Sequence, residues 1–474
     1  MAPPPHRIVP LIVAVALFME NMDSTIIATS LPAIATDIGT NPLALKLAVT
    51  SYLLSLAIFI PASGWTADRF GVRTVFRAAI AVFVIGSVAC AFSHSLAGFV
   101  VARIVQGMGG AMMTPVGRMV LIRTIDRREL VGAMAWVTTP ALIGPVMGPP
   151  LGGFITTYAS WHWIFFINVP IGLLGIVLVT RYIEDLRAAE HERFDVVGMV
   201  LAGLGIGGLA FGLSVLGLNF LPWPIVALLL GGGAVVFGAY LVHARRTPNP
   251  ALDLTLFRLP TFRASVGGGF LFRLGIGALP FLLPLMLQVG FGMTPFQSGL
   301  ITFASAIGAM TMKLGVATIL RTFGFRTVLI ANALISAVFL AACAAFTPTT
   351  PVSVMFIVLA VGGFFRSLEF TSINTLAYAE VEPKRVGRAT SLVSVVQQLA
   401  ISSGVAIGAL IVETVVQLKD EPRIAARDFP IAFVLIAAVS AASVLIFARL
   451  PQHAGSDMTA RRPVPAAPSD QGVG

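Results

Sequence analysis

The chain alternates between long apolar runs and short polar loops. A helix that crosses the hydrocarbon core of a bilayer needs about 20 mostly apolar residues. Fourteen runs are long enough, so the pattern predicts an all-α membrane protein with fourteen transmembrane helices. The predicted helices span residues 8–30, 46–65, 74–93, 97–118, 131–157, 163–182, 196–217, 223–243, 262–288, 297–320, 326–346, 352–376, 389–417 and 429–449.

The composition agrees with a membrane location. Hydrophobic residues make up 57% of the 474 residues and charged residues only 11%, and the mean hydropathy is +0.92. A soluble domain, by comparison, carries roughly 25% charged residues. The net charge of +10 would indicate a nucleic-acid partner in a soluble protein. Here the basic residues stand singly between apolar runs, so we expect a lipid bilayer and no nucleic acid as the partner.

The basic residues also predict the orientation of the helices. With the N-terminus in the cytoplasm, 23 of the 31 Lys and Arg residues fall in cytoplasmic loops and ends, four in outer loops and four inside helices. Because basic loops stay in the cytoplasm, this bias predicts an even number of crossings and two cytoplasmic termini. The first run is too long for a signal-peptide core and contains Glu20 and Asp23, which indicates a retained helix. The polar, Pro-rich tail 451–474 is predicted to be disordered.

The sequence contains an internal repeat. Residues 70–75 recur in closely similar form at 323–328, an offset of 253 residues, and each copy lies between two apolar runs. Such a repeat is typical of a membrane protein built from two halves related by an axis along the membrane normal. It predicts six-helix bundles at 1–182 and 262–450. Helices 7 and 8, within 183–261, are left as linker helices between them.

Several other chemistries lack sequence support. No lysine follows a glycine, so the chain has no phosphate-binding loop for ATP. The six histidines fall at predicted helix ends, loops or tails, so neither a histidine relay nor a metal site is expected. We find no nucleophile, base or metal-ligand set that would face one membrane surface, which argues against a membrane enzyme or lipid-handling scaffold. Each of the two cysteines lies deep in an apolar run, so a disulfide framework is not expected.

Five motifs carry a resemblance to a known family. The loop 64–73 is similar to the loop 2–3 signature of the major facilitator superfamily, and 144–153 in helix 5 is similar to the antiporter motif of its exporters. Residues 19–32 and 161–172 resemble signatures of its 14-helix drug:proton antiporters of EmrB/QacA type, and Arg103-x-x-Gln106-Gly107 resembles the family's helix-4 arginine motif. Within that group the chain most resembles the MdtD-like multidrug transporters.

The resemblance implies a function. It implies a major facilitator fold, two six-helix bundles plus two linker helices, in a secondary transporter of the bacterial inner membrane. Such a transporter exports small amphipathic compounds in exchange for protons, uses the proton gradient and no cofactor, and is expected to be a monomer. A proton-coupled importer or a uniporter on the same fold is the alternative.

Two of the motifs predict gating elements. Gly71 permits a tight turn, and Asp68 is expected to meet basic side chains or a helix N-terminus across the seam between the halves. In helix 5, prolines remove backbone donors and glycines admit a neighbouring helix, which predicts a pliable seal; simple kinking is the alternative. The predicted gating residues are Gly64, Asp68, Arg69, Gly71, Arg73, Gly144, Pro145, Gly148, Pro149, Gly152, Gly153 and Arg326.

Asp23 is the predicted proton carrier, with Arg103 as its partner and Glu20 on the same helix face. At 1.5 Å per residue, Asp23 lies about 22 Å along helix 1 and Arg103 about 9 Å from the outer end of helix 4, so their depths coincide in a core of about 30 Å. Protonation of Asp23 would release Arg103. A static Asp–Arg strut, or an Asp23–Thr25 hydrogen bond, is the alternative.

The second half carries more intramembrane cations than carboxylates. Arg273, at the repeat position of Glu20, is expected to face the cavity, and Glu369 could pair with Arg366 at i, i+3. Lys313 lies about 10 Å from the cytoplasmic end of its helix, so snorkelling is an alternative to a cavity role. The predicted cavity therefore makes an organic anion, such as a carboxylate metabolite, a second candidate substrate. The predicted cavity residues are Glu20, Arg273, Lys313, Arg366 and Glu369.

Overall fold

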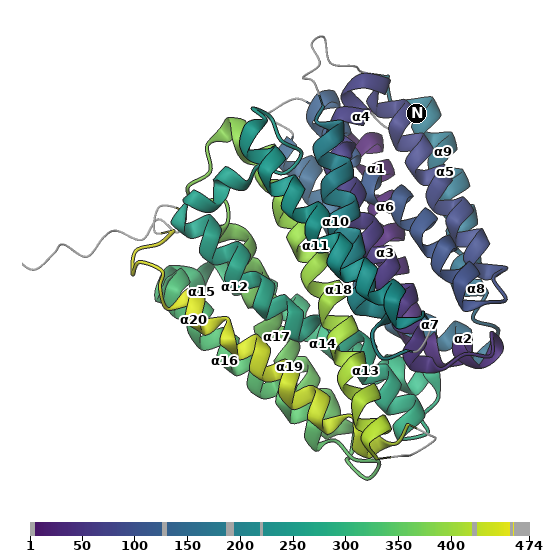
Figure 1. Cartoon of the computed structure of the whole chain (residues 1–474). Coiled ribbons are helices and arrows are strands. Elements are labelled where there is room, and N and C mark those ends of the chain that lie inside the picture. Colours follow the sequence, from purple (N-terminus) through teal and green to yellow (C-terminus); the bar gives the residue numbers. More distant parts are fainter. Residues whose placement is uncertain are drawn as a thin grey trace, which may run out of the picture.

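The computed structural model describes residues 5–125, 130–185, 194–218, 221–419, 424–455 and 458, and the elements described in these ranges are all helical. Figure 1 shows them as a set of long, tilted helices. The long helices are α1 (Pro5–Ile26), α3 (Lys46–Phe59), α5 (Val72–Ala91), α6 (Leu96–Thr124), α7 (Leu130–Tyr158), α9 (Asn168–Tyr182), α10 (Val196–Val215), α11 (Trp223–Arg246), α12 (Pro260–Gly277), α14 (Pro295–Lys313), α16 (Phe325–Ala342), α17 (Val352–Leu376), α18 (Val386–Leu418) and α19 (Pro430–Ala442). The short ones are α2 (Leu31–Asp37), α4 (Ser63–Phe70), α8 (Trp163–Phe166), α13 (Leu279–Leu285), α15 (Val316–Phe323) and α20 (Val444–Phe447).

The helices account for most of the predicted spans. In the described part of the chain, 12 helices are long and apolar enough to cross a membrane, and 13 if α14 and α15, bent by 63° at their junction, form one span. Helix α7 occupies the position of the fifth predicted span, but its interior contains four prolines and it is not among those counted. A multi-pass membrane protein is therefore established, while the count of fourteen stays a prediction.

The helices pack as two bundles. In the N-terminal bundle α1 packs against α7, α3 against α6, and α5 against both α6 and α9. In the C-terminal bundle α12 packs against α18 and α19, and α17 against α14 and α16. Figure 1 shows the two bundles converging at one end and spreading apart toward the other.

We call the two ends of the molecule the basic end and the far end. The basic end carries the turns at Gly71 and Gly324, and the far end carries the loops after α5 and α16. The core of the C-terminal bundle continues into the far end of the N-terminal bundle, where Ile26, Trp161 and Phe165 belong to the same buried cluster. This structure is thus sealed between the bundles at the far end.

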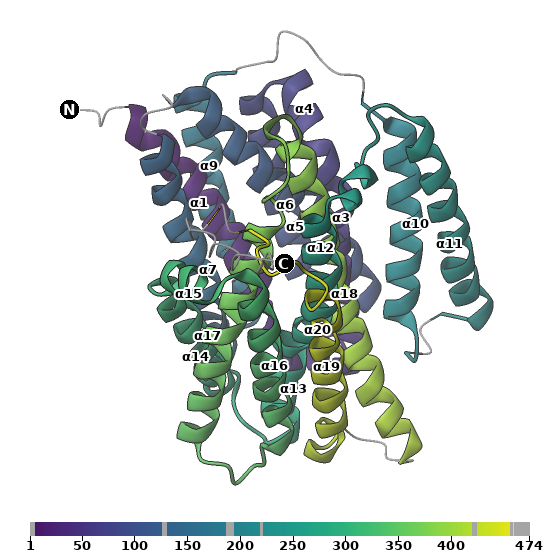
Figure 2. The same ribbon diagram turned by 90° about the vertical axis from the view of Figure 1, so that its left-hand side faces the viewer.

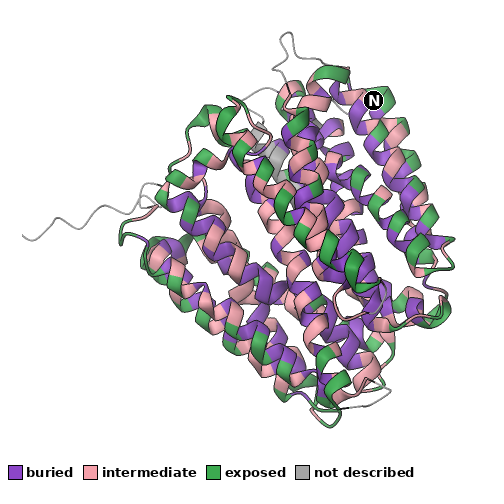
Figure 3. Cartoon of the chain, in the orientation of Figure 1, coloured by how far each residue is buried: buried purple, intermediate pink, exposed green. Residues whose placement is uncertain are grey.

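Helices α10 and α11 form a hairpin beside the two bundles, as Figure 2 shows. Only 22% and 17% of their most apolar windows are buried, compared with 78% for the span 42–70, and Figure 3 shows the hairpin's largely unburied surface. Helix α10 packs on both α3 and α18, and so covers the seam between the bundles. This arrangement suits linker helices whose outer faces meet lipid; the domain boundaries themselves stay a prediction.

The loop after α11 attaches the hairpin to the C-terminal bundle. Arg385 donates to Asp253 Oδ2 at 2.7 Å, and Tyr240 of α11 bonds the backbone of Leu252 at 3.0 Å. Burial favours the neutral carboxyl of Asp253, but hydrogen bonds from Thr255 and Arg385 outweigh it, so the pKa of Asp253 lies below its usual value. An ionised Asp253 therefore anchors this loop at neutral pH.

The repeated turn has the same geometry in both halves. Gly71 and Gly324 have φ angles of +92° and +76°, which favour glycine, and each joins a short helix to a long one. A Cβ on Gly71 would also lie 2.1 Å from Asp185 Oδ1. Both the backbone and the neighbouring carboxylate thus require glycine at position 71.

Candidate functional site

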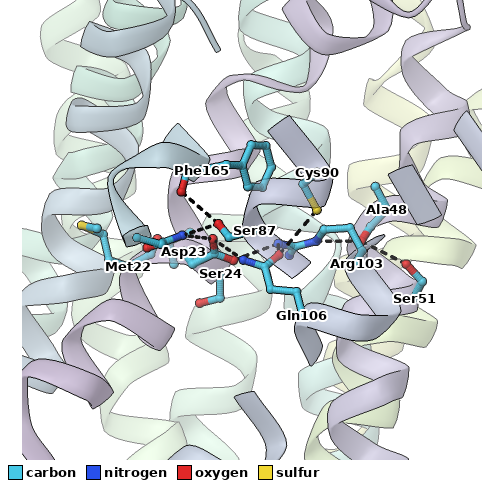
Figure 4. Close-up of polar contacts among 12 residues, drawn as sticks. Met22, Asp23, Ser24, Ala48, Ser51, Ser87, Cys90, Arg103, Gln106 and Phe165 are labelled. Atoms are coloured by element: carbon cyan, nitrogen blue, oxygen red, sulfur yellow. Dashed lines mark hydrogen bonds and ion pairs between the residues drawn. The ribbon is translucent and has the colours of Figure 1, made fainter. Parts of the chain in front are cut away.

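A buried polar network lies inside the N-terminal bundle, as Figure 4 shows. It is centred on Asp23 of α1, whose Oδ2 accepts a 2.8 Å hydrogen bond from Arg103 of α6. Asp23 Oδ1 accepts from Gln106 Nε2 and from Asn168 Nδ2, each at 2.8 Å. The side chains of Asp23 and Arg103 are 0% and 1% exposed. The predicted pairing of Asp23 with Arg103 is therefore present, and its role in proton transfer stays a prediction.

The network fits an ionised Asp23. Three donors meet the two oxygens of Asp23, and Arg103 also donates to Gln106 Oε1 at 2.6 Å and to Ala48 O at 3.3 Å. The Arg103 guanidinium lies 4.2 Å from the Tyr52 ring centroid, a cation–π contact. A buried ion pair of this kind persists only with good geometry and further hydrogen bonds. Loss of the charge on Asp23 would leave Arg103 without its counter-ion.

The sequence motifs contained two members of this network without assigning them a role. Gln106 lies in the helix-4 arginine motif and Asn168 in the motif that opens α9, and both are fully buried. Asn168 continues the network to Ser87 of α5 at 2.9 Å. Glu20 lies outside it: it accepts from Thr114 of α6 at 2.7 Å.

Glycines of the helix-5 motif bring α7 against α1. A Cβ on Gly148 would lie 2.1 Å from Thr25 Oγ1, and one on Gly152 would lie 2.3 Å from Ile26 O. A Cβ on Gly144, one turn earlier, would lie 3.0 Å from Phe18 O. The spacing of four residues places these glycines on one face, which allows close packing of the helix that carries Asp23.

Gly153 belongs to the seam between the bundles. A Cβ on Gly153 would lie 2.3 Å from the carbonyl oxygen of Pro295 in α14, and one on Gly299 would lie 2.3 Å from the carbonyl oxygen of Pro149. At the far end, these two glycines thus let the backbones of α7 and α14 approach each other closely. Pro149 and Gly153 contribute to the seal there, while the prolines at 140 and 145 lie farther along α7 toward the basic end.

We expect Gly153→Val to weaken the far-end seal. The added side chain meets backbone, which cannot move aside as a flexible side chain would. The variant should leak substrate down its gradient and accumulate less of it in vesicles. The matched control is Gly231→Val on the hairpin, where a Cβ meets nothing within 4 Å. Equal accumulation by both variants and wild type would contradict the seal.

The turn at the basic end makes contacts inside its own bundle. Asp68 forms an ion pair with Arg123 of α6, and within the described ranges this partner lies in its own bundle and not, as expected, across the seam. Arg69 lies over the Trp65 ring at 5.3 Å. Arg326, the repeat counterpart of Arg73, donates to Ala448 O at 2.9 Å. The gating roles of these residues stay predictions, and Asp68 is available to a partner across the seam only after rearrangement.

The predicted cations of the C-terminal bundle contact neutral partners. Arg273 of α12 is 1% exposed and donates to Asn374 Oδ1 at 2.6 Å. Arg366 contacts Ser305 Oγ, and Lys313 donates to Thr371 Oγ1 at 2.9 Å. Among the residues that the structure describes, none of the three cations forms an ion pair, so neither the Arg366–Glu369 nor the Glu20–Arg273 pair is made here.

An ion pair across the seam escaped the sequence analysis. Lys46, at the start of α3, lies 3.4 Å from Glu413 of α18 and donates to Leu216 O at the end of α10 at 3.1 Å. The side chain of Lys46 is 0% exposed and that of Glu413 is 12% exposed. By its sequence position Lys46 is an outer-loop cation, because that position does not reveal the hairpin that packs against it. The pair joins both bundles and the hairpin at the far end.

Comparisons with known proteins agree with this architecture. The Major Facilitator Superfamily model matches residues 13–195 and 266–470, the two bundles without the hairpin. Proteins named "Putative multidrug resistance protein MdtD" from Salmonella heidelberg and Salmonella typhimurium are each 38% identical, over 95% of this chain and 96% of theirs.

Solved transporter structures share the fold. A bacterial homologue of the human lysosomal transporter Spinster, in an inward-facing and unoccupied conformation, superimposes with a TM-score of 0.65 at 16% identity, over 98% of this chain and all of that one. The nucleoside transporter NupG gives 0.62 at 14% identity, over 93% and 99%. The matched family model, the similarity to MdtD and the two bundles together show that the chain belongs to the major facilitator superfamily of transporters.

Proposed function

We propose that this transporter exports small amphipathic compounds by exchanging them for protons. The observation that carries the proposal is the buried network around Asp23, in which one titratable carboxylate neutralises Arg103. Protonation of Asp23 removes the charge that Arg103 requires, so one proton changes the stability of this arrangement by a few kcal/mol. The proton gradient is the only energy source that this scheme needs, and it requires no cofactor.

The orientation of the chain in the membrane follows from its basic loops, and the conformational state follows from the far-end seal. Basic loops stay in the cytoplasm, so the basic end is cytoplasmic, with both termini on that side of the bacterial inner membrane. A far-end seal then corresponds to an inward-facing state, ready to load substrate from the cytoplasm. Export also agrees with the drug-resistance name of the MdtD relatives, whereas import on the same fold has no such support.

Reporter fusions test this topology. Fusions after Gly217, at the tip of the hairpin, and after Ala425, between α18 and α19, should both report the periplasm. A fusion after Arg246 should report the cytoplasm, because the next basic loop begins there. A cytoplasmic signal at Gly217 or Ala425 would overturn the orientation and the number of crossings.

Transport into inverted vesicles tests the function. Vesicles that contain the wild-type chain should accumulate at least one member of a panel of lipophilic cations and organic anions when the lumen is acidic. Collapse of the pH gradient should abolish this accumulation. Gradient-independent equilibration of every compound, in vesicles shown to contain folded protein, would contradict proton-coupled export.

A second candidate is the export of an organic anion by the same mechanism. Arg273 favours it, because this buried guanidinium contacts the neutral Asn374, and its Nε has no hydrogen-bond partner in the described part of the chain. Arg273 also lies 5.4 Å from the Phe370 ring centroid, so an aromatic surface and a cation adjoin. A carboxylate with an apolar body would suit both groups.

The charge of residue 273 distinguishes the two candidates. For an anionic substrate we expect Arg273→Gln to lower transport of a carboxylate by about tenfold or more, since a hydrogen bond to a charged group contributes about 1.5–3 kcal/mol. Transport of a cation of matched size should not fall. Arg263→Gln, an exposed cation near the start of the same helix, is the control. Unchanged carboxylate transport in Arg273→Gln would exclude the anion site.

A further inference from the structure

Glu369 is a second carboxylate buried within a bundle. It lies on α17 of the C-terminal bundle, and the residue is 0% exposed. Its Oε2 accepts a 3.1 Å hydrogen bond from Asn332 Nδ2 of α16, and the same amide nitrogen donates to Phe365 O at 2.6 Å. Glu369 therefore points into the space between α16 and α17, and its partner is neutral.

The hydrogen bonding of Glu369 differs from that of Asp23. Three donors, one of them a guanidinium, meet the oxygens of Asp23. Among the residues that the structure describes, neither Glu369 Oε1 nor Asn332 Oδ1 has a hydrogen-bond partner. A carboxylate in this position would be a buried charge with one donor, whereas buried ions require pairing and several hydrogen bonds.

We propose that Glu369 is a second proton-binding site and that it carries its proton in the inward-facing state. A proton on Oε1 supplies the donor that this acid–amide pair lacks, since both atoms without partners are otherwise acceptors. It also removes the buried negative charge. The two bundles thus hold their carboxylates in different forms, Asp23 ionised against Arg103 and Glu369 neutral against Asn332.

Arg273 provides the counter-charge for the deprotonated form. It contacts Phe370 and Asn374, which lie on the same helix as Glu369. A Cβ on Gly269 would meet both the Arg273 guanidinium and the side chain of Ile373, which lies one turn after Glu369. The unpartnered Nε of Arg273 lies on the same buried side chain. In the proposed cycle, proton release is accompanied by a rearrangement that brings the ionised Glu369 to this donor.

Other charged groups around α17 are engaged or exposed. From α14, Lys313 donates to Thr371, and Arg366 of α17 itself contacts Ser305 of α14. From α15, Arg321 is exposed. From α16, Arg326 donates to Ala448 O, and from α12, Arg273 contacts Phe370 and Asn374 of α17. Release of the proton therefore couples Glu369 chiefly to α12.

This inference extends the proposed proton antiport, on which its transport consequence rests. The proton enters from the far side in the outward-facing state and leaves to the cytoplasm as substrate loads. Release leaves a carboxylate that neutralises Arg273, which lowers the positive charge of the C-terminal bundle by one. Exchange then moves one more proton per substrate than Asp23 alone would move.

Infrared spectroscopy of the full-length protein in liposomes tests the protonation state directly. We expect the difference spectrum between wild type and Glu369→Gln at neutral pH to contain the carbonyl band of a protonated carboxylic acid. The glutamine amide can keep the hydrogen bond with Asn332, so this variant mimics the protonated side chain. Asn332→Ala should shift the band, because it removes the hydrogen bond to Oε2. The control Glu380→Gln changes a carboxylate that accepts from Thr261 near the basic end, and it should keep the band.

Proton counting tests the coupling. The number of protons exchanged per substrate should fall by about one in Glu369→Gln and stay unchanged in Glu380→Gln. A difference spectrum between wild type and Glu369→Gln that lacks this band would overturn the protonated site. Loss of the band in Glu369→Gln with an unchanged number of protons per substrate would overturn the part of Glu369 in transport. If the wild type exchanges no protons at all, the proposed antiport fails, whereas the band still decides the protonation of Glu369.

Discussion

Asp23→Asn should lower pH-driven accumulation of substrate by about tenfold per unit of pH gradient while the protein still exchanges substrate across the membrane. An amide of the same shape can still bond Gln106 and Asn168, so the bundle keeps its packing, but it cannot bind and release a proton. Each coupled proton contributes about 1.4 kcal/mol per unit of pH gradient, or about tenfold accumulation. We therefore expect accumulation in a one-unit gradient to fall by about tenfold in Asp23→Asn, and to none when this change is combined with Glu369→Gln.

Counterflow of labelled substrate provides the second readout. It requires binding and rocking of the bundles but no net proton movement, so Asp23→Asn should retain it. Asp37→Asn is the matched control, because that carboxylate lies at the far end and is 53% exposed. Undiminished pH-driven accumulation in Asp23→Asn would rule out Asp23 as the proton carrier. Loss of counterflow with normal folding would assign Asp23 to substrate binding or gating.

Removing Glu413 should shift the transporter toward its outward-facing state. In the far-end-closed state, Glu413→Gln leaves the buried Lys46 ammonium without a counter-charge, with the Leu216 carbonyl and the glutamine amide as neutral acceptors. Loss of one member of a buried ion pair costs about 3–5 kcal/mol. Because opening the seam returns Lys46 to water, the cost falls on the closed state alone. We expect the ratio of closed to open molecules to fall by about two orders of magnitude, with Leu216 limiting the effect.

Spin labels at His94 and Thr349, on the far-end loops of the two bundles, measure this shift. The distance distribution should move to longer values in Glu413→Gln, and Lys46→Met with Glu413→Leu should partly restore it. Lys419→Gln is the matched control, because its ion pair with Asp428 lies at the same end within one bundle. Identical distributions in wild type and Glu413→Gln would show that the pair does not hold the seam.

Most of the architecture could be predicted because the membrane constrains it. Apolar runs of fixed length and short basic loops mark the helices, and the repeat marks the halves. The Asp23–Arg103 pair was predictable for the same reason, since depth along two straight helices fixes which side chains can meet. The turn at Gly71 followed from its copy at Gly324, and both have the positive φ that such a turn requires.

Contacts between distant segments were not predictable in this way. Lys46 looks like a loop cation, and only packing against α18 and the hairpin buries it. Glu369 lies three positions after Arg366, a spacing that permits a pair. In the structure, however, Arg366 contacts Ser305 and Glu369 accepts from Asn332, both on neighbouring helices. Asp68 was expected to reach across the seam, and in an arrangement sealed at the far end it meets Arg123 instead. Rotation of each helix and the state of the transporter decide these partners, and neither is encoded in local spacing.

Direct observation of proton movement tests proton-coupled export most closely. Inverted vesicles that contain the wild-type chain and a pH-sensitive dye are acidified inside, and a transported compound is then added outside. In wild type and in the control Asp37→Asn the lumen should become less acidic as substrate enters, in Asp23→Asn this change should be smaller, and in Asp23→Asn combined with Glu369→Gln it should be absent. Substrate accumulation in wild-type vesicles without any change in luminal pH would contradict proton-coupled export.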